Sequence, residues 1–453
     1  MDDTNFLQNP KLDDETSSRI RSDIMELISK YTDIAHAKKP FSPGKTLIPA
    51  SGKVFGKIEL QMLVSSSLDF WLTAGRFNAE FEKQLSQFLN IKHVVTTNSG
   101  SSANLLALSA LTSEQLGTKS LNSGDEVITV SAGFPTTVNP ILQNNLVPVF
   151  VDVKIPEYVI DENLIEENIT TKTKAIMIAH TLGNSFNVKK ITEIAKKHNL
   201  WLIEDCCDAL GSKYDNKFLG TFGDLSTLSF YPAHHITMGE GGAVLTNNHQ
   251  LKRIVESFRD WGRDCFCSPG KSNTCGKRFE LKLGELPFGY DHKYTYSHVG
   301  YNLKLTDMQA AVGLAQLERL PDFISKRQEN FDFLYKNLSA YEDFLILPKP
   351  SLGCIPSWFG FPITVKSNQN FSKGSLVNFL SSKLIDSRPI FAGNIIKQPY
   401  FKNKSFKTSS SLSNTEKIMN DSFWIGVFPG LSNEMLEYIV QQFDSFFRSN
   451  FNN

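Results

Sequence analysis

The sequence predicts an α/β protein with a large domain built on a mostly parallel sheet and a smaller α+β domain after it. From about residue 90, short β-branched runs alternate with helical stretches; the runs are HVVTT at 93, EVITVS at 126, VPVFVDV at 147, KAIMIA at 174 and LWLIED at 200. This alternation is typical of parallel strands covered by helices on both faces. In such a sheet, binding residues gather where strands end and loops lead into helices.

Three segments are expected along the 453 residues, a length that suffices for two or three domains. Residues 46–322 form the large domain, which the helical segment KLTDMQAAVGLAQLERL closes at 304–320. Residues 323–453 form the small domain, with the strand-like run WFGFPITV at 358 and a final amphipathic helix. Residues 1–45 form an arm that ends in an amphipathic helix, because apolar residues recur there at helical spacing: Ile20, Ile24, Leu27, Ile28 and Tyr31.

Charge and composition narrow the class of protein. Lys plus Arg and Asp plus Glu both total 47, so the formal net charge is zero, which argues against nucleic acid or an anionic membrane as the main partner. The stretch MDDTNFLQNPKLDDETSS lacks the pattern of a signal peptide, and no apolar run reaches the roughly 18 residues of a membrane span. We therefore expect a cytoplasmic protein whose six cysteines are free, catalytic or metal-bound rather than disulfide-bonded.

Several strand ends carry residues that suit a phosphate and a planar ring. After HVVTT, the segment NSGSSANLLALSAL offers serine hydroxyls and backbone N–H groups at a helix N-terminus, which form an anion site. Phe134 follows the next strand, where it stacks on a ring or packs in the core. Asp205 ends LWLIED, where an acid pairs with a protonated pyridine nitrogen or caps a helix. Each feature alone has an ordinary explanation, but their order, with Ser229 and a basic residue five positions on, favours a pyridoxal phosphate (PLP) site.

At these residues the chain resembles the DegT/StrS sugar aminotransferases and dehydratases, which have the type I aspartate aminotransferase fold. The resemblance covers roughly residues 45–445 and runs through WLTAGRFNAEFE, NSGSSANLLAL, IEDCCDALGS, SFYPAHHITMGEGGAV and GYNLKLTDMQAA. It implies a homodimer with shared sites, in which the loop bearing GYN makes Asn302 a phosphate ligand of the neighbouring subunit. The other cofactor residues that it implies are Gly100, Ser101 and Ser229 at the phosphate, Phe134 on the ring and Asp205 at the ring nitrogen.

His234 occupies the position of the lysine that holds the cofactor aldehyde as a Schiff base in that family, and the window SFYPAHHITMGEGG contains no lysine. Without that amine, the resting cofactor is expected to be pyridoxamine phosphate (PMP), held by its phosphate, its ring and Asp205. The amine of PMP can join a ketone, and a base is then needed at the cofactor carbon C4′. Histidine titrates near neutrality and suits this task. The sequence therefore predicts His234 as the base of a dehydration beside the ketone, and the window is similar to that of PMP-dependent sugar 3-dehydratases acting on nucleotide-linked 4-keto-6-deoxyhexoses. No role is assigned to His235.

Three cysteines, Cys265, Cys267 and Cys275, lie in a polar loop at 263–278. Three thiols in one exposed cytosolic loop favour a soft metal centre, and their spacing alone leaves zinc and iron–sulfur open. The CDP-4-keto-6-deoxyglucose 3-dehydrase branch of the resembled family carries a [2Fe–2S] cluster on C-x57-C-x-C-x7-C, which this chain matches when Cys207 is the fourth ligand. That branch implies electron transfer from an NADH-dependent flavin and iron–sulfur reductase. Cys206 is then a buried neighbour, and Cys354 is a core thiol without a partner pattern.

The small-domain loop SRPIFAGNIIKQPYF offers Arg388, Phe391 and Asn394 to the substrate, and such a loop can close over a site. Arginine suits a pyrophosphate, although Arg388 in a surface ion pair is the alternative. Two other functions remain open: a GDP-4-keto-6-deoxymannose 3-dehydratase type without the cluster, which the cysteine loop disfavours, and a non-catalytic sugar-nucleotide or metal-binding scaffold, which the intact Asp205, Ser229 and His234 disfavour.

Overall fold

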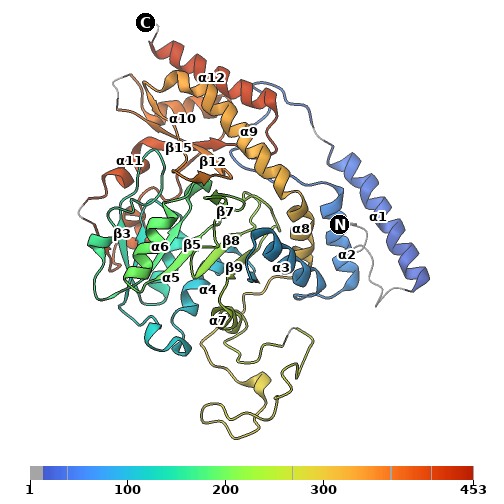
Figure 1. Cartoon of the computed structure of the whole chain (residues 1–453). Helices are drawn as coiled ribbons and strands as arrows, with labels where there is room; N and C mark the ends of the chain where they lie inside the picture. Colours follow the sequence, from blue (N-terminus) through green and yellow to red (C-terminus); the bar gives the residue numbers. More distant parts are fainter. Residues whose placement is uncertain (1–13, 38, 268, 368–369, 410, 452–453) are drawn as a thin grey trace.

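The structure, a computed structural model, describes residues 14–37, 39–267, 269–367, 370–409 and 411–451 (Figure 1). Its large sheet has eight strands in the order β1-β9-β8-β5-β4-β2-β3-β14. From β8 to β14 every neighbouring pair is parallel, whereas β9 is antiparallel to both of its neighbours. The strands are β1 (His93–Thr97), β2 (Glu126–Val130), β3 (Val147–Val151), β4 (Thr173–Ala179), β5 (Trp201–Asp205), β8 (Leu225–Ser229), β9 (Gly242–Thr246) and β14 (Lys407–Thr408). The predicted mostly parallel sheet is confirmed.

Helices cover both faces of this sheet, because successive side chains of a strand point to opposite sides. In β4, Ile176 and Ile178 pack in one core with residues of α3, α6 and α8, whereas Ala175 and Met177 pack in a second core with residues of α4 and α7. The helices of the large domain are α2 (Lys57–Asp69), α3 (Arg76–Leu89), α4 (Gly100–Ala110), α5 (Pro135–Gln143), α6 (Val188–Lys197), α7 (His249–Arg259) and α8 (Asp307–Glu318).

The small domain is an antiparallel sheet in the order β10-β12-β15-β13, packed against three helices. Its core joins apolar residues of α9, α10 and α12 to those of β12 and β15. The elements are α9 (Leu320–Leu338), β10 (Leu345–Ile346), β12 (Gly360–Val365), α10 (Lys373–Ser382), β13 (Ser387–Pro389), α11 (Ser413–Asp421), β15 (Ser422–Gly426) and α12 (Asn433–Phe451). A third, minor sheet joins β6 (Lys213–Tyr214), β7 (Lys217–Phe218) and β11 (Cys354–Ile355).

The chain passes between the domains in two ways that the sequence segments did not anticipate. The boundary at 322/323 falls inside α9, which runs from the large domain into the small one (Figure 1). Residues Lys407 and Thr408, assigned to the small domain, form β14 at the edge of the large sheet. The loop between β13 and β14 is therefore attached to the small sheet at one end and to the large sheet at the other.

Residues 1–13 of the predicted arm lie outside the described residues, and the part from residue 14 on contains the predicted amphipathic helix, α1 (Glu15–Ala35). Its buried Arg21 binds Asp69 at the end of α2 at 2.7 Å, and Gln61 of α2 donates a hydrogen bond to the carbonyl oxygen of Met25. These contacts fasten α1 to the large domain along α2. In the described part of the chain, no helix has both the length and the apolar character that crossing a bilayer requires.

Candidate active site

One pocket of about 990 Å³ lies at the carboxyl ends of the large-sheet strands and is bounded on its far side by β13. It brings together residues that are far apart in the sequence, because the ends of parallel strands meet at one edge of a sheet. The sequence-predicted residues that line it are Gly100, Ser101, Phe134, Asp205, Cys207, Ser229, His234, Arg388 and Phe391. The described residues that line it include no lysine.

The amino-terminal end of α4 forms one wall of the pocket. Ser99 caps this helix by accepting a hydrogen bond from the backbone N–H of Ser102 at 3.1 Å, and Ser101 donates one to Thr136 of α5 at 3.2 Å. A Cβ atom at Gly100 would overlap the side chain of Ser229, so the close approach of α4 to β8 requires glycine. N–H groups in the first turn of a helix have no partner within the helix and suit a phosphate.

Asp205 ends β5 and is almost fully buried. Its carboxylate accepts hydrogen bonds from Thr137 at 2.7 Å, from the amide of Asn104 at 2.8 Å and from the backbone N–H of Cys207 at 3.1 Å. These donors hold the acid in one orientation at the pocket wall, where it can accept a further hydrogen bond from a protonated ring nitrogen. Sequence reasoning missed Asn104 and Thr137, whose small polar side chains carry no distinctive pattern.

Phe134 stands at the mouth of the pocket with half of its surface exposed. It caps α5 and meets Phe391 of the small domain edge to face, with ring centroids 6.1 Å apart. An exposed aromatic ring at a pocket wall is available to stack on a planar ligand. Together with the helix end and Asp205, it makes the pocket fit a phosphate-bearing pyridine such as PMP.

His234 follows β8, and its side chain lines the pocket beside Asp208 and Phe359. Its Nδ1 lies 3.5 Å from Oδ1 of Asp208, and its ring packs against that of Phe359 with centroids 5.3 Å apart. Burial lowers the pKa of His234 to about 4, whereas burial and the charge of Asp205 raise the pKa of Asp208 to about 8. The imidazole is therefore neutral near pH 7 and can accept a proton.

This depressed pKa predicts the acidic limit of the reaction that His234 would catalyse. Because the imidazole loses its basic nitrogen only when the pH falls through its pKa, activity should persist below pH 6.5, the usual value for histidine. The measurement is the pH dependence of kcat/KM for exchange of the C4′ hydrogen of PMP, which reports the free enzyme. A limb centred at or above pH 6.5 would contradict this assignment.

The substrate residues predicted in the small-domain loop separate in the structure. Arg388 and Phe391 line the pocket, and Arg388 forms an ion pair with Asp386. Asn394 is not among the residues that line it: its side chain is buried, accepts a hydrogen bond from Ser131 at 2.7 Å and donates one to Glu416 at 2.8 Å. Asn394 thus fastens the loop to the end of β2. Further residues of this loop, Gln398 and Tyr400, do line the pocket and were not singled out from the sequence.

Asn302 also lies outside the pocket of its own chain. It is exposed, forms a backbone bridge with Asp260, and accepts a hydrogen bond from Lys304 at 2.8 Å. An exposed position is consistent with the expected contact to a second subunit.

The cysteine segment projects from the large domain after α7 (Figure 1). The backbone N–H of Thr274 donates to Sγ of Cys267 and that of Lys277 donates to Sγ of Cys275, both at 3.4 Å. Burial raises the pKa of Cys267, but hydrogen bonds from Thr274 outweigh it and hold this pKa below its usual value. Such donors stabilise thiolates, the form that binds soft metals, so the surroundings of Cys267 and Cys275 suit a metal–sulfur centre. Burial instead raises the pKa of Cys265. Cys207 lies in the pocket wall, and none of its described hydrogen bonds involves the three loop cysteines.

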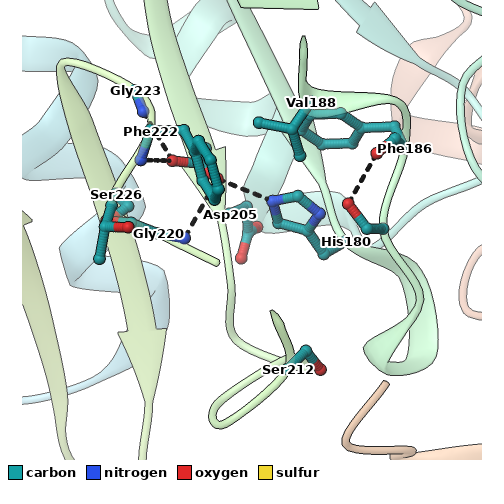
Figure 2. A network of polar contacts seen from close by, with 12 residues as sticks. His180, Phe186, Val188, Asp205, Ser212, Gly220, Phe222, Gly223 and Ser226 are labelled. Atoms are coloured by element: carbon teal, nitrogen blue, oxygen red, sulfur yellow. Dashed lines mark hydrogen bonds and ion pairs between the residues drawn. The ribbon is translucent and has the colours of Figure 1, made fainter. Parts of the chain in front are cut away.

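Among the described residues, one group of potential metal ligands has its ligand atoms within 4.8 Å of one another, and it consists of His180, Glu204 and Cys206. The predicted cluster ligands Cys207, Cys265, Cys267 and Cys275 are not brought together in this way. The Glu204 carboxylate already accepts four hydrogen bonds, from His180 at 3.0 Å and from the backbone N–H groups of Gly220, Phe222 and Gly223 (Figure 2). His180 stacks on Phe186 with ring centroids 4.1 Å apart. Because both carboxylate oxygens are used, this group anchors the loop that leads into β8 rather than binding a metal.

The fold, with the first turn of α4 and Asp205 at the end of β5 in one pocket, defines a protein of the PLP-dependent transferase class. The chain belongs to the DegT/DnrJ/EryC1/StrS aminotransferase family, whose model matches residues 56–444, as its motifs predicted. It is 59% identical over 436 residues to "Lipopolysaccharide biosynthesis protein RfbH" of Salmonella typhimurium, covering 96% of this chain and 100% of that protein.

Two further relatives extend this comparison. The chain is 50% identical over 406 residues to the dTDP-4-dehydro-2,6-dideoxy-D-glucose 3-dehydratase of Saccharopolyspora spinosa, covering 90% of this chain and 88% of that one. The solved structure of E. coli GDP-4-keto-6-deoxy-D-mannose-3-dehydratase with bound hydrated PLP superposes with a TM-score of 0.78 at 27% identity, covering 88% of this chain and 99% of that chain. The predicted aminotransferase-like fold is thereby confirmed.

Proposed function

We propose that the protein is a PMP-dependent 3-dehydratase of a nucleotide-linked 4-keto-6-deoxyhexose, most specifically CDP-4-keto-6-deoxy-D-glucose, in 3,6-dideoxysugar biosynthesis. The observation that carries this proposal is His234 in a pocket whose described residues include no lysine. A base without an amine can move protons at the cofactor but cannot anchor an aldehyde. The two relatives named as 3-dehydratases and the relative named for lipopolysaccharide biosynthesis support it.

Each residue of the pocket then has a task. Gly100, Ser101 and Ser229 bind the cofactor phosphate, and Asp205 accepts a hydrogen bond from the ring nitrogen. Phe134 stacks on the ring. When bound, PMP supplies the amine that joins the sugar ketone and a ring that draws electrons from C4′. His234 takes the proton from C4′ and returns a proton to the departing hydroxyl, so that water leaves.

The substrate side uses the loop after β13. Arg388 is exposed at the pocket edge, where its guanidinium can exchange Asp386 for the diphosphate of the nucleotide. Phe391 packs against Phe134 and closes the wall beside the sugar. Comparing CDP-, dTDP- and GDP-linked 4-keto-6-deoxyhexoses under identical conditions identifies the nucleotide.

The same proposal includes a [2Fe–2S] cluster on Cys207, Cys265, Cys267 and Cys275. A cluster held there would supply one-electron transfer, which suits the two electrons that deoxygenation at C3 requires from an NADH-dependent flavin and iron–sulfur reductase. The hydrogen bonds donated to the sulfur atoms of Cys267 and Cys275 support two of these ligands. The position of Cys207 beside Asp205 would put the cluster next to the cofactor, which requires the cysteine segment to approach the pocket wall.

We further propose a homodimer in which Asn302 of each copy binds the cofactor phosphate of the other. Its exposure and its absence from the lining of its own pocket support this arrangement. The alternative is a dehydratase without electron relay, as in the GDP-4-keto-6-deoxymannose 3-dehydratases. It gives no role to the three thiols of the loop or to the hydrogen-bond donors beside them.

Protein purified without oxygen tests both halves of the proposal. We expect PMP to be released intact by denaturation and iron and labile sulfide to be present in equal amounts, with the visible absorption of a [2Fe–2S] centre. Cys207→Ser should lose the iron, whereas Cys206→Ser, a change at the adjacent buried thiol, should retain it. A colourless protein that contains zinc would contradict the cluster, and bound PLP in covalent linkage would contradict the PMP assignment.

A further inference from the structure

His234 also lines a second cavity, of about 10 Å³. This volume is close to the smallest that holds one water molecule. The polar side chains that line it belong to Lys53, His234, His235, Thr237, Gln316 and Arg327. His234 lines both cavities, so a molecule in the small one would lie beside the proposed base.

His235 is fully buried, and its protonation pattern follows from its contact. Its Nε2 lies 2.8 Å from the carbonyl oxygen of Ser357. A carbonyl oxygen only accepts, so Nε2 carries the hydrogen and Nδ1 is a bare acceptor. This Nδ1 is buried and has no hydrogen-bond partner among the described residues. A buried acceptor without a donor is costly, which points to a small polar molecule beside it.

Within the described residues, Arg327 has a buried hydrogen-bond donor without an acceptor, whereas His235 has a buried acceptor without a donor. It extends from α9, is 1% exposed, and donates to the carbonyl oxygens of Trp358 at 3.1 Å, Phe359 at 3.3 Å and His234 at 3.2 Å. Its Nε–H is a buried donor without a partner in the described part of the chain. One cavity is thus lined by a side chain with an unused donor and a side chain with an unused acceptor.

We propose that this cavity is a binding site for one water molecule, and that Arg327 and His235 act through it as positioning residues for His234. The water accepts a hydrogen bond from Nε–H of Arg327 and donates one to Nδ1 of His235. Because Arg327 also binds the backbone carbonyl of His234, the network fixes the backbone that carries the base. The kinetic part of this proposal rests on the proposed function, whereas the water site itself does not.

The first test is a high-resolution crystal structure of the holoenzyme. We expect one ordered water within hydrogen-bonding distance of both Nε of Arg327 and Nδ1 of His235. Direct contact between the two side chains, or a cavity without density, would overturn the proposal. This result is independent of whether the protein dehydrates sugars, so it separates a failure of the water site from a failure of the proposed function.

The second test uses two variants that divide the contacts of His235. In His235→Gln the amide nitrogen can take the place of Nε2 and keep the bond to Ser357, but the acceptor facing the cavity is lost. In His235→Asn the amide oxygen can take the place of Nδ1, and the bond to Ser357 is lost. C4′ hydrogen exchange should therefore fall about tenfold in His235→Gln at unchanged KM, the scale of one lost positioning hydrogen bond, and by a smaller factor in His235→Asn.

The loss of thermal stability should rank the two variants in the opposite order. His235→Asn should unfold at a lower temperature than His235→Gln, because it removes a buried hydrogen bond to Ser357. Arg327→Lys should lower exchange more than His235→Gln, because lysine keeps the charge but loses both the donor to the water and the fixed contact to His234. Equal losses of exchange in the two His235 variants, tracking their losses of thermal stability, would show a purely structural role and overturn the positioning assignment.

Discussion

Replacing His234 with asparagine is expected to abolish exchange of the C4′ hydrogen of PMP while leaving the cofactor bound. Asparagine is smaller but polar and cannot accept a proton at neutral pH, so the general base is removed. General-base catalysis contributes about 10²- to 10⁴-fold, and a loss within this range is expected. The residues proposed to hold PMP, among them Gly100, Ser101, Phe134 and Asp205, act without the imidazole, so the cofactor should stay bound. The measurement is wash-out of C4′ label in the presence of substrate, beside PMP content by absorbance.

Two controls sharpen this experiment. His234→Lys places an amine in the same slot and should retain PLP covalently after borohydride reduction, which tests whether the slot reaches C4′. If His234→Asn exchanged the hydrogen at the rate of the unmodified protein, His234 would not be the base. Asp208, whose Oδ1 lies 3.5 Å from the imidazole, would then be the next candidate.

The second large effect is expected from Cys267→Ser, which should leave C4′ exchange intact and abolish product formation with the reductase. Serine is a poor ligand for a soft metal centre, so the cluster is lost or its potential is altered. Dehydration needs no net electrons, whereas deoxygenation needs two, and so the two activities separate. The assays are label exchange without reductant and 3-deoxysugar formation with NADH and the reductase.

Cys354→Ser is the matched control for this substitution. Cys354 lies in β11, and burial raises the pKa of its thiol to about 12, which disfavours the thiolate. We expect full iron content and turnover in this variant. Unimpaired turnover of Cys267→Ser with the reductase would refute the electron-relay role.

The large sheet was predictable because its parallel strands are buried on both faces and read as continuous β-branched runs. HVVTT coincides with β1, and LWLIED ends with Asp205 at the end of β5 as expected. The positions of these residues at strand ends then predicted that they meet at one edge of the large sheet: Gly100, Phe134, Asp205, Ser229 and His234. The residue order did not reveal β9, a short antiparallel strand between β1 and β8. The residue types of a strand do not indicate the direction in which it runs in the sheet.

The rest of the site depends on contacts between distant segments. Asp208 and Arg327 reach His234 from a loop after β5 and from α9, and neither belongs to a local pattern. Asn394 has the residue type of a substrate ligand, but its hydrogen bonds to Ser131 and Glu416 use its amide for the loop itself. Residue type could not distinguish these two uses.

The loop between β13 and β14 is attached at both ends, and this limits how its length can differ among related proteins that bind other sugar nucleotides. Ile395 donates a backbone hydrogen bond to Ser131 and β14 pairs with β3, so an inserted or deleted residue would shift one of these registers. Relatives with other sugar nucleotides would then differ here by exchange of side chains at fixed loop length. Tyr400, which lines the pocket without holding the loop to the large sheet, is a position free to change, whereas Arg388 is expected to stay because every sugar nucleotide carries the diphosphate.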